Sequence, residues 1–237
     1  YVHRHATDRD IYWVNNRSGR TENIEVVFRT EGKVPELWFA EDGRKEPLSY
    51  SIANGLTTVK LHLEPYDAVF VGFKEKAVKN SVTLPPLRST SMQLLSGKWS
   101  VSFQKDRGAP AVIQMDELSS WSTNADSRVK YFSGTATYAQ SFQIEGKTLK
   151  DHPEIWLDLG SVKQIAEVKI NGRPLGILWH SPFRMNVSGF LKSGENQLEV
   201  EVTNLWVNRL IGDAQKEVTR KVTYTTIPFY QANSPLL

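Results

Sequence analysis

Residues 154 to 213 decide the fold, and they read EIWLDLGSVKQIAEVKINGRPLGILWHSPFRMNVSGFLKSGENQLEVEVTNLWVNRLIGD. Apolar and polar residues alternate in three segments of this stretch, and one face of an extended strand collects every second side chain. The three alternating sets are Ile155, Leu157 and Leu159; Ala166, Val168 and Ile170; and Leu198, Val200 and Val202. Because the shared apolar face of such strands needs a second sheet to cover it, the pattern predicts an antiparallel β-sandwich.

Short turn signals separate these alternating segments. Asn171-Gly172 directly follows the second set, and this dipeptide tolerates the positive φ values of a type I′ turn. The third strand opens from a turn at Gly194-Glu195-Asn196. Asp42-Gly43, much earlier in the chain, predicts a second hairpin of the I′ type.

The first 80 residues have the pattern of a separate small β-sandwich. Short apolar or alternating segments recur about every ten residues, with no helical periodicity between them. The run Ala68 to Phe73 is almost continuously apolar, which is typical of a strand buried on both faces. The other predicted strands are Asp10 to Val14, Ile24 to Phe28, Glu36 to Ala40 and Val59 to Leu63.

A change of composition marks the connection between two domains. Residues 74 to 90 begin with charged side chains and continue to Pro85-Pro86, where two fixed φ angles disfavour a helix and favour extended polyproline geometry. We therefore expect an all-β chain of two consecutive sandwiches, residues 1–80 and 95–237, joined by a linker at 81–94. In the second domain the shared face of Trp99, Val101 and Phe103 predicts a core strand, and Val222 to Ile227 a late one.

Composition excludes several classes of function. The 237 residues contain no cysteine, which excludes disulfides, thiolate chemistry and cysteine-bound zinc. No apolar run approaches the roughly 20 residues of a membrane-spanning helix. The net charge of +3 is dispersed without a run of Lys or Arg, so a nucleic-acid partner is not expected. The opening Tyr1-Val2-His3-Arg4 reads as the middle of a longer protein, and we expect any export signal upstream.

The longer motifs of the chain resemble a known family. DLG at 158–160, AEV at 166–168, the Asn171-Gly172 turn and the NRLIGD run at 208–213 resemble the galactose-binding-like jelly-roll module of family 2-type glycoside hydrolases. The likeness extends to the C-terminal region of α-L-rhamnosidases of glycoside hydrolase family 106. It covers SW at 120–121 and YFSGTATY at 131–138, as well as the segments 3–15 and 63–73 of the first domain.

This resemblance carries several implications. The second domain would be a galactose-binding-like jelly roll, and the first would follow a catalytic barrel. The tail would continue past PLL at 235–237 into a final strand. The parent protein would be a periplasmic or extracellular enzyme of plant-polysaccharide breakdown, with its catalytic acid and base in the barrel rather than at any position of this sequence.

The residues themselves offer no catalytic constellation. Glycoside hydrolysis needs two facing carboxyl groups about 5 to 9 Å apart. The carboxylates here lie mostly at turns, as Asp42 and Glu195 do, or at outward strand positions, as Glu199 and Glu201 do. His3 and His5 share a face of an extended strand, but no third ligand is spaced to complete a metal site. We expect no catalytic residue, metal or cofactor, and the sequence does not support a structural calcium.

One end of the second sandwich is the candidate site. Aromatic rings stack on sugar faces while polar side chains bind the hydroxyls, and jelly-roll loops often gather such residues at one end. The residues expected to converge there are Trp121, Tyr131, Trp179, His180 and Arg184. Their partner would be a carbohydrate or the missing catalytic domain. Core packing is the alternative for Trp121, Trp179 and His180, which stand at strand-to-loop transitions.

The segment from Asn204 to Asp213 is expected to organise a loop rather than bind a ligand. Trp206 continues the parity of Leu198, Val200 and Val202, which predicts a core position. The residues expected to hold the loop by hydrogen bonds and an Arg–carboxylate pair are Asn204, Asn208, Arg209 and Asp213.

Taken together, the sequence predicts a non-catalytic accessory region of an exported glycoside hydrolase. Its role would be to support the catalytic barrel, with carbohydrate binding as a further possibility. Two other hypotheses remain open: an independent carbohydrate-binding module, and a purely structural or interaction module. Sugar binding would separate these two.

Overall fold

The computed structural model describes residues 1–85, 89–227 and 229–237. The part of the linker prediction that rests on Pro86 therefore lies outside the described residues. The chain forms two compact units, Tyr1–Ser91 and Met92–Leu237, and each is described by itself. No helix in the described part of the chain has the length and apolar character needed to cross a membrane.

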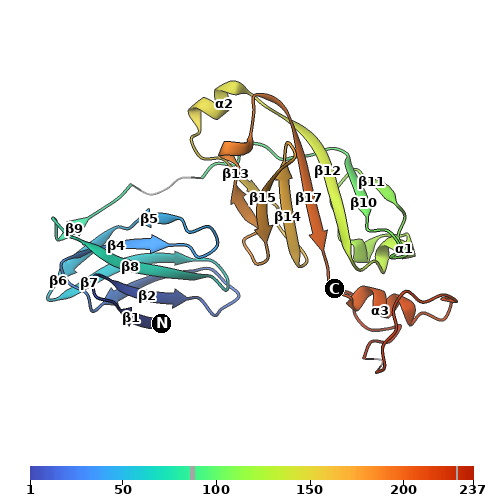
Figure 1. The fold of residues 1–237 in the computed structure, drawn as a ribbon, viewed down its shortest axis with the longest axis horizontal. Coiled ribbons are helices and arrows are strands. Elements are labelled where there is room, and N and C mark those ends of the chain that lie inside the picture. The colour runs from blue at the N-terminus through green and yellow to red at the C-terminus, as the bar shows by residue number, and fades with distance from the viewer. Residues whose placement is uncertain (86–88, 228) are drawn as a thin grey trace. The chain divides into compact units, whose positions relative to one another are not determined.

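Unit 1 is a sandwich of two antiparallel sheets (Figure 1). The five-stranded sheet has the order β1 (Val2–His5), β2 (Asp10–Asn15), β8 (Ala68–Lys76), β4 (Lys33–Trp38) and β5 (Lys45–Pro47). The four-stranded sheet has the order β3 (Glu22–Phe28), β7 (Leu56–Leu63), β6 (Tyr50–Ala53) and β9 (Ser81–Val82). The small sandwich predicted for this part of the chain is confirmed.

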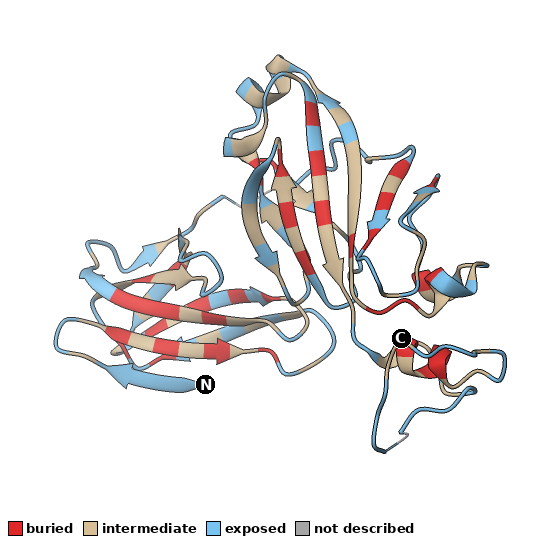
Figure 2. Cartoon of the chain, turned by 45° about the vertical axis from the view of Figure 1, so that its right-hand side comes forward, coloured by how far each residue is buried: buried red, intermediate tan, exposed pale blue. Residues whose placement is uncertain are grey.

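The core of unit 1 follows from alternation along strands such as β2 and β7 (Figure 2). Val59, Leu61 and Leu63 of β7 are each at most 3% exposed, whereas the residues between them face outward. From the facing sheet, β2 contributes Tyr12 and Val14 to the same apolar cluster. A period of two thus buries one face of each sheet and leaves the other to solvent.

One predicted turn of unit 1 is wrong, and a turn that was not predicted has the expected geometry. The Asp42-Gly43 hairpin is not of type I′, because only Gly43 has a positive φ (70°). The loop is longer: the Phe39 and Arg44 backbones bond across it, and the Asp42 carboxylate accepts the Arg44 amide at 2.9 Å. The two-residue turn with two positive φ values is Asn54-Gly55 (52° and 76°), which joins β6 to β7.

The boundary of unit 1 lies beyond residue 80. Ser81 and Val82, expected in the linker, form β9 and pair with Ser51 and Tyr50 of β6. The Leu84 amide also donates to the Ser49 hydroxyl at 3.0 Å. The first part of the expected linker is therefore built into the sandwich.

Unit 2 contains a six-stranded antiparallel sheet and a two-stranded sheet. The larger sheet has the order β11 (Val112–Met115), β10 (Trp99–Phe103), β12 (Thr135–Ile144), β17 (Gly194–Thr203), β14 (Ile165–Ile170) and β15 (Arg173–Leu178). The smaller one pairs β13 (Trp156–Asp158) with β16 (Arg184–Asn186). Two 3-10 helices lie at Trp121–Thr123 and Ser188–Phe190.

The stretch that decides the fold is placed as its alternation predicts. Ala166, Val168 and Ile170 of β14 are at most 1% exposed, and Ala166 and Val168 pair with the neighbouring β17 residues Val202 and Val200. Asn171 and Gly172 have φ values of 53° and 75°, and the flanking residues Ile170 and Arg173 are paired. The two-residue hairpin is confirmed, and with it the all-β sandwich.

Short helices were not anticipated from the sequence. They are α1 (Ser127–Lys130), α2 (Gly146–Asp151) and α3 (Val207–Asp213). At four to seven residues they are too short to show a helical period.

The strand predicted for Val222 to Ile227 is wrong, since no strand is formed there. The physical reason is that the Val222 and Thr223 amides donate to the Asp213 carboxylate, at 3.0 and 2.6 Å, instead of to a strand partner.

Candidate functional site

Trp121 does not belong to the predicted surface. Its side chain is 7% exposed and lies in the core of unit 2, with its ring 5.8 Å from Phe103, 5.3 Å from Phe132 and 6.3 Å from Tyr138. The 3-10 turn that Ser120 caps directs the ring inward. The same aromatic cluster buries the Tyr138 phenol, and this burial raises the Tyr138 pKa to about 12.

Trp179 and His180 lie together at the end of β15. Trp179 is 66% exposed, and its ring meets the His180 ring edge-on at 4.7 Å. The His180 Nδ1 atom lies 2.8 Å from the Ser181 carbonyl oxygen, a bond that depends on the tautomer. A large exposed ring beside an imidazole is the kind of surface that a sugar or a protein partner can cover.

Tyr131 and Arg184 belong to other elements than Trp179 and His180. The strand register places Tyr131 at the same end of the large sheet as Trp179, because Thr135 pairs with Thr203 and Leu178 with Ala166. Three strand spacings separate β12, which follows Tyr131, from β15, which precedes Trp179, and this is roughly 14 Å. Arg184 belongs to β16 of the two-stranded sheet, opposite Asp158. The prediction of one surface shared by all five residues is therefore wrong for Trp121, and the register keeps Tyr131 away from Trp179.

Tyr131 instead packs on α3. A Cβ atom added to Gly212 would lie 2.5 Å from the Tyr131 Cβ, so the helix backbone rests directly on this side chain. Only glycine permits so close an approach. Tyr131 therefore forms part of the seat of α3.

Four polar residues fasten α3 and the tail to the sandwich. The Asn204 side chain bonds the backbone of the segment that leads into β12. It accepts the Gly134 amide at 2.9 Å and donates to the Phe132 carbonyl at 3.0 Å. Asn208 bonds both backbone groups of Leu237, accepting its amide at 2.9 Å and donating to its carbonyl at 3.1 Å. These side chains satisfy backbone groups that have no partner in a helix or strand, and they thereby fix the loops.

Arg209 and Asp213 form a buried ion pair one turn apart on α3. Their closest atoms are 2.9 Å apart, and their side chains are 8% and 5% exposed. The other Asp213 oxygen accepts the Val222 and Thr223 amides and the Thr223 hydroxyl. One carboxylate thus neutralises a buried cation and fixes the start of the tail.

Trp206 is not a core residue, contrary to the parity argument. Its side chain is 45% exposed, and the Arg107 guanidinium lies over its ring at 4.7 Å. The reason is that β17 ends at Thr203, and Trp206 already has helical backbone angles as the N-cap residue of α3. A period of two has no meaning beyond the end of its strand.

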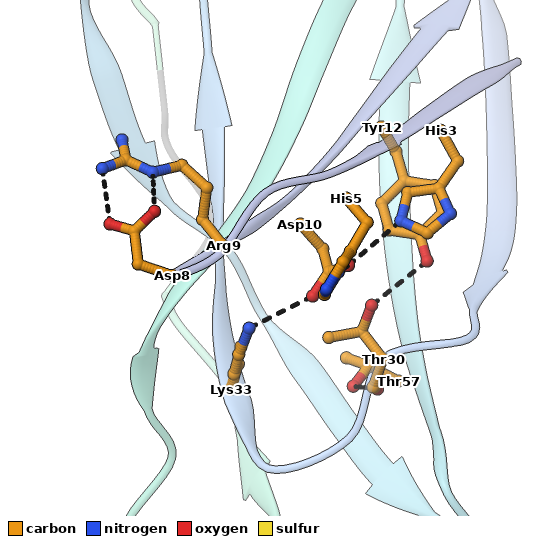
Figure 3. A network of polar contacts seen from close by, with 9 residues as sticks. All are labelled: His3, His5, Asp8, Arg9, Asp10, Tyr12, Thr30, Lys33 and Thr57. Atoms are coloured by element: carbon orange, nitrogen blue, oxygen red, sulfur yellow. Dashed lines mark hydrogen bonds and ion pairs between the residues drawn. The ribbon is translucent and has the colours of Figure 1, made fainter.

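A second polar cluster, in unit 1, was only half visible in the sequence. Figure 3 shows His3 and His5 of β1 pointing toward Asp10 of β2. The Asp10 Oδ1 atom lies 2.7 Å from His5 Nδ1 and 3.1 Å from His3 Nε2, and Lys33 donates to Oδ2 at 3.1 Å. The spacing of the two histidines indicated a shared face, but their acceptor lies on a partner strand.

The electrostatics of this cluster suit an anchor more than an acid catalyst. Burial alone would raise the Asp10 pKa, but the bonds from His5, His3 and Lys33 outweigh burial and lower that pKa to about 2. The His3 ring also stacks on the Tyr12 ring at 4.0 Å, and the Tyr12 hydroxyl lies 3.2 Å from that of Thr30. Within the described residues, no group of three His, Cys, Asp or Glu side chains could hold a metal ion.

Comparison with known proteins bears on both units. The alpha-L-rhamnosidase model of glycoside hydrolase family 106 matches residues 1–52, and the glycosyl hydrolase 2 galactose-binding domain-like model matches residues 119–231. The structure of the rhamnosidase from Novosphingobium sp. PP1Y is 44% identical over 99% of this chain, with a TM-score of 0.94. The resemblance to the family 106 α-L-rhamnosidases is confirmed. The galactose-binding-like fold of unit 2 is confirmed with it.

The chain is much shorter than these relatives. It covers 22% of the Novosphingobium rhamnosidase, and 17% of a putative beta-glucuronidase from Formosa agariphila that is 40% identical over 202 residues. The two relatives carry the names of different glycosidases. What they share with this chain is therefore a glycoside-hydrolase-related region.

Proposed function

We propose that this chain is a non-catalytic accessory region of an exported glycoside hydrolase, with α-L-rhamnosidase as the activity of the parent protein. The observation that carries the proposal is the match to the Novosphingobium rhamnosidase, which extends over 99% of this chain but only 22% of that enzyme. A region of this kind would support the catalytic domain of an enzyme acting on plant polysaccharide, in the periplasm or outside the cell.

The two buried carboxylates support a structural role. A glycosidase needs a carboxylic acid with a raised pKa facing a second carboxylate. Asp10 has a pKa lowered to about 2 and is bonded to three cationic or cation-forming side chains. Asp213 is occupied by Arg209 and by the backbone of residues 222 and 223. Both groups hold the fold, and the proposed role requires neither a metal nor a cofactor.

Turnover of an aryl α-L-rhamnoside tests the proposal. We expect no hydrolysis by the 237-residue chain, and hydrolysis by the full polypeptide that its gene encodes. The matched comparison is the same chain with Asp10→Asn and, separately, with Asp213→Asn. Turnover by the 237-residue chain that disappears on neutralising a single carboxylate would refute the non-catalytic assignment.

A second candidate function is weak carbohydrate binding at the end of β15. The observation that favours it is Trp179, whose ring is 66% exposed beside His180. In that case calorimetry with L-rhamnose and rhamnose-containing oligosaccharides would show saturable binding, which Trp179→Ala would abolish. Trp156→Ala is the control, since this second exposed indole (38%) lies on β13. If no binding were detected, support of the catalytic domain would be the single remaining role.

A further inference from the structure

The tail after α3 exposes an unusual concentration of apolar side chains. Tyr224 is 86% exposed, Ile227 60% and Phe229 80%. They fall within six consecutive residues, a span of at most about 20 Å. We refer to these three side chains as the tail patch. Monomeric proteins seldom expose such rings and aliphatic groups together unless a partner covers them.

Specific contacts hold the backbone around this patch. Residues 222 and 223 are fixed before it by Asp213, which is itself buried against Arg209. After the patch, the Gln215 side chain donates to the Ala232 carbonyl at 3.0 Å, and Asn208 bonds Leu237 twice. The described residues on either side of the patch are thus tied to α3 and its flank, while the three side chains of the patch are exposed. Such fixation lowers the entropic cost of binding a partner.

Charge indicates the kind of partner. The exposed side chains between α3 and the patch include Lys216, Arg220 and Lys221 against the single carboxylate of Glu217. A surface that complements this segment would carry apolar pockets beside carboxylates. A two-fold contact between copies of this chain would instead bring the same cations face to face. Ile227 and Phe229 also lack any polar group that could bind a sugar hydroxyl.

We propose that the tail patch docks onto the catalytic domain of the same polypeptide, in apolar pockets rimmed by carboxylates. This inference rests on the proposed function, because it requires a further domain in the full protein. The share of a related rhamnosidase that lies outside the matched region supplies room for that domain, since the chain covers 22% of that enzyme. Docking would place the tail patch at the interface with the catalytic domain, in place of the surface that the sequence predicts at one end of the second sandwich.

The test compares the 237-residue chain with the polypeptide that its gene encodes. The triple variant Tyr224→Ser, Ile227→Ser, Phe229→Ser should change the Tm of the short chain by no more than about 2 °C, because the side chains are exposed there. In the full polypeptide the same variant should lower the transition temperature of this region by more than about 5 °C, because the side chains are buried there. Val78→Ser with Leu94→Ser is the control, since these exposed side chains (97% and 84%) lie outside the patch.

Hydroxyl-radical footprinting gives a second readout that does not depend on stability. Oxidation of Tyr224 and Phe229 should be several-fold slower in the full polypeptide than in the short chain, with Tyr66, 72% exposed in unit 1, as the reference. Equal oxidation in both proteins, or equal effects of the triple variant on both, would overturn the docking proposal while the accessory role stood. A gene that encodes no further glycosidase domain would overturn both proposals.

Discussion

The Arg209 guanidinium lies 2.9 Å from the Asp213 carboxylate, and neither side chain is more than 8% exposed. Folding therefore removes both of these opposite charges, one helical turn apart, from water. Each is tolerated only because the other is present, since an unpaired buried charge is far more costly than a paired one. The same carboxylate holds residues 222 and 223, so a single pair couples α3 to the tail.

Removing one partner of this pair should be costly. We expect Asp213→Asn to lower the free energy of unfolding by about 3–5 kcal/mol, because Arg209 stays buried without its counter-charge. Urea unfolding measures the loss, and hydrogen exchange at the Val222 and Thr223 amides reports the release of the tail. Glu201→Gln is the control: its ion pair with Lys169 is 30% exposed, and such pairs contribute at most about 1 kcal/mol. Similar losses in the two variants would contradict this account.

Stability should depend on pH through Asp10. The pKa of Asp10 is about 2 in the folded chain against an ordinary value of 3.8. Its contribution is therefore present above about pH 4 and is lost as the pH falls toward 2, with a size of about 2 kcal/mol. Subtracting the unfolding free energies of Asp10→Asn from those of the parent chain between pH 2 and 6 isolates the effect. The control is Asp8→Asn, at an exposed neighbouring carboxylate, which should keep most of the pH dependence of the parent chain. If the difference between the parent chain and Asp10→Asn did not change with pH, the linkage would be ruled out.

The Asn171-Gly172 turn should not accept a β-branched residue. Gly172 has a φ of 75°, and no atom lies within 4 Å of an added Cβ, so the penalty of Gly172→Val comes from backbone strain alone. We expect a loss of about 1–3 kcal/mol in denaturant unfolding. Gly189→Val is the matched control, since its Cβ also meets open space but its φ is not positive. Equal stability of the Gly172→Val and Gly189→Val variants would contradict the strain expected at the Asn171-Gly172 turn, and with it the role of this turn in setting the register of β14 and β15.

Two tryptophans that look alike in sequence should behave oppositely. Trp121→Ala should cost about 3–5 kcal/mol, because the ring is buried among three other aromatic rings. Trp179→Ala should change stability by less than about 0.5 kcal/mol, because its ring is mostly exposed. Chemical denaturation of both variants, followed by far-ultraviolet circular dichroism, checks the contrast. A small loss at Trp121 would place that ring outside the core.

Local patterns in the sequence were sufficient for most of the fold. The alternation at Ala166, Val168 and Ile170 and the dipeptide after it predict a strand and a hairpin that the structure contains. Both signals act over a few residues. The same reasoning failed at Asp42-Gly43, where the hydrogen bonds of a longer loop determine the turn.

The candidate site was predictable only in part, because it depends on contacts between distant residues. The sequence predicts a strand-to-loop transition at both Trp121 and Trp179, but Trp121 begins a 3-10 helix and is buried, whereas Trp179 follows the end of β15 and is exposed. Asp10 acquires its low pKa from His3 and His5 on a paired strand and from Lys33 further along the chain. The prediction for Trp206 failed because β17 ends at Thr203, and the seven residues of α3 are too few to show a helical period in the sequence.

The strand β1 has a consequence for how the protein behaves at high concentration. It forms one edge of the five-stranded sheet and pairs with β2, while all four of its residues are exposed. Its polar side chains His3, Arg4 and His5 make a poor template for a strand of a neighbouring molecule. Without β1, the unpaired edge would belong to β2 and its sequence IYWV, which is apolar and rich in β-forming residues. The hydrogen bonds from two histidines to Asp10 therefore hold in place the strand that keeps one copy of this sheet from adding to the next.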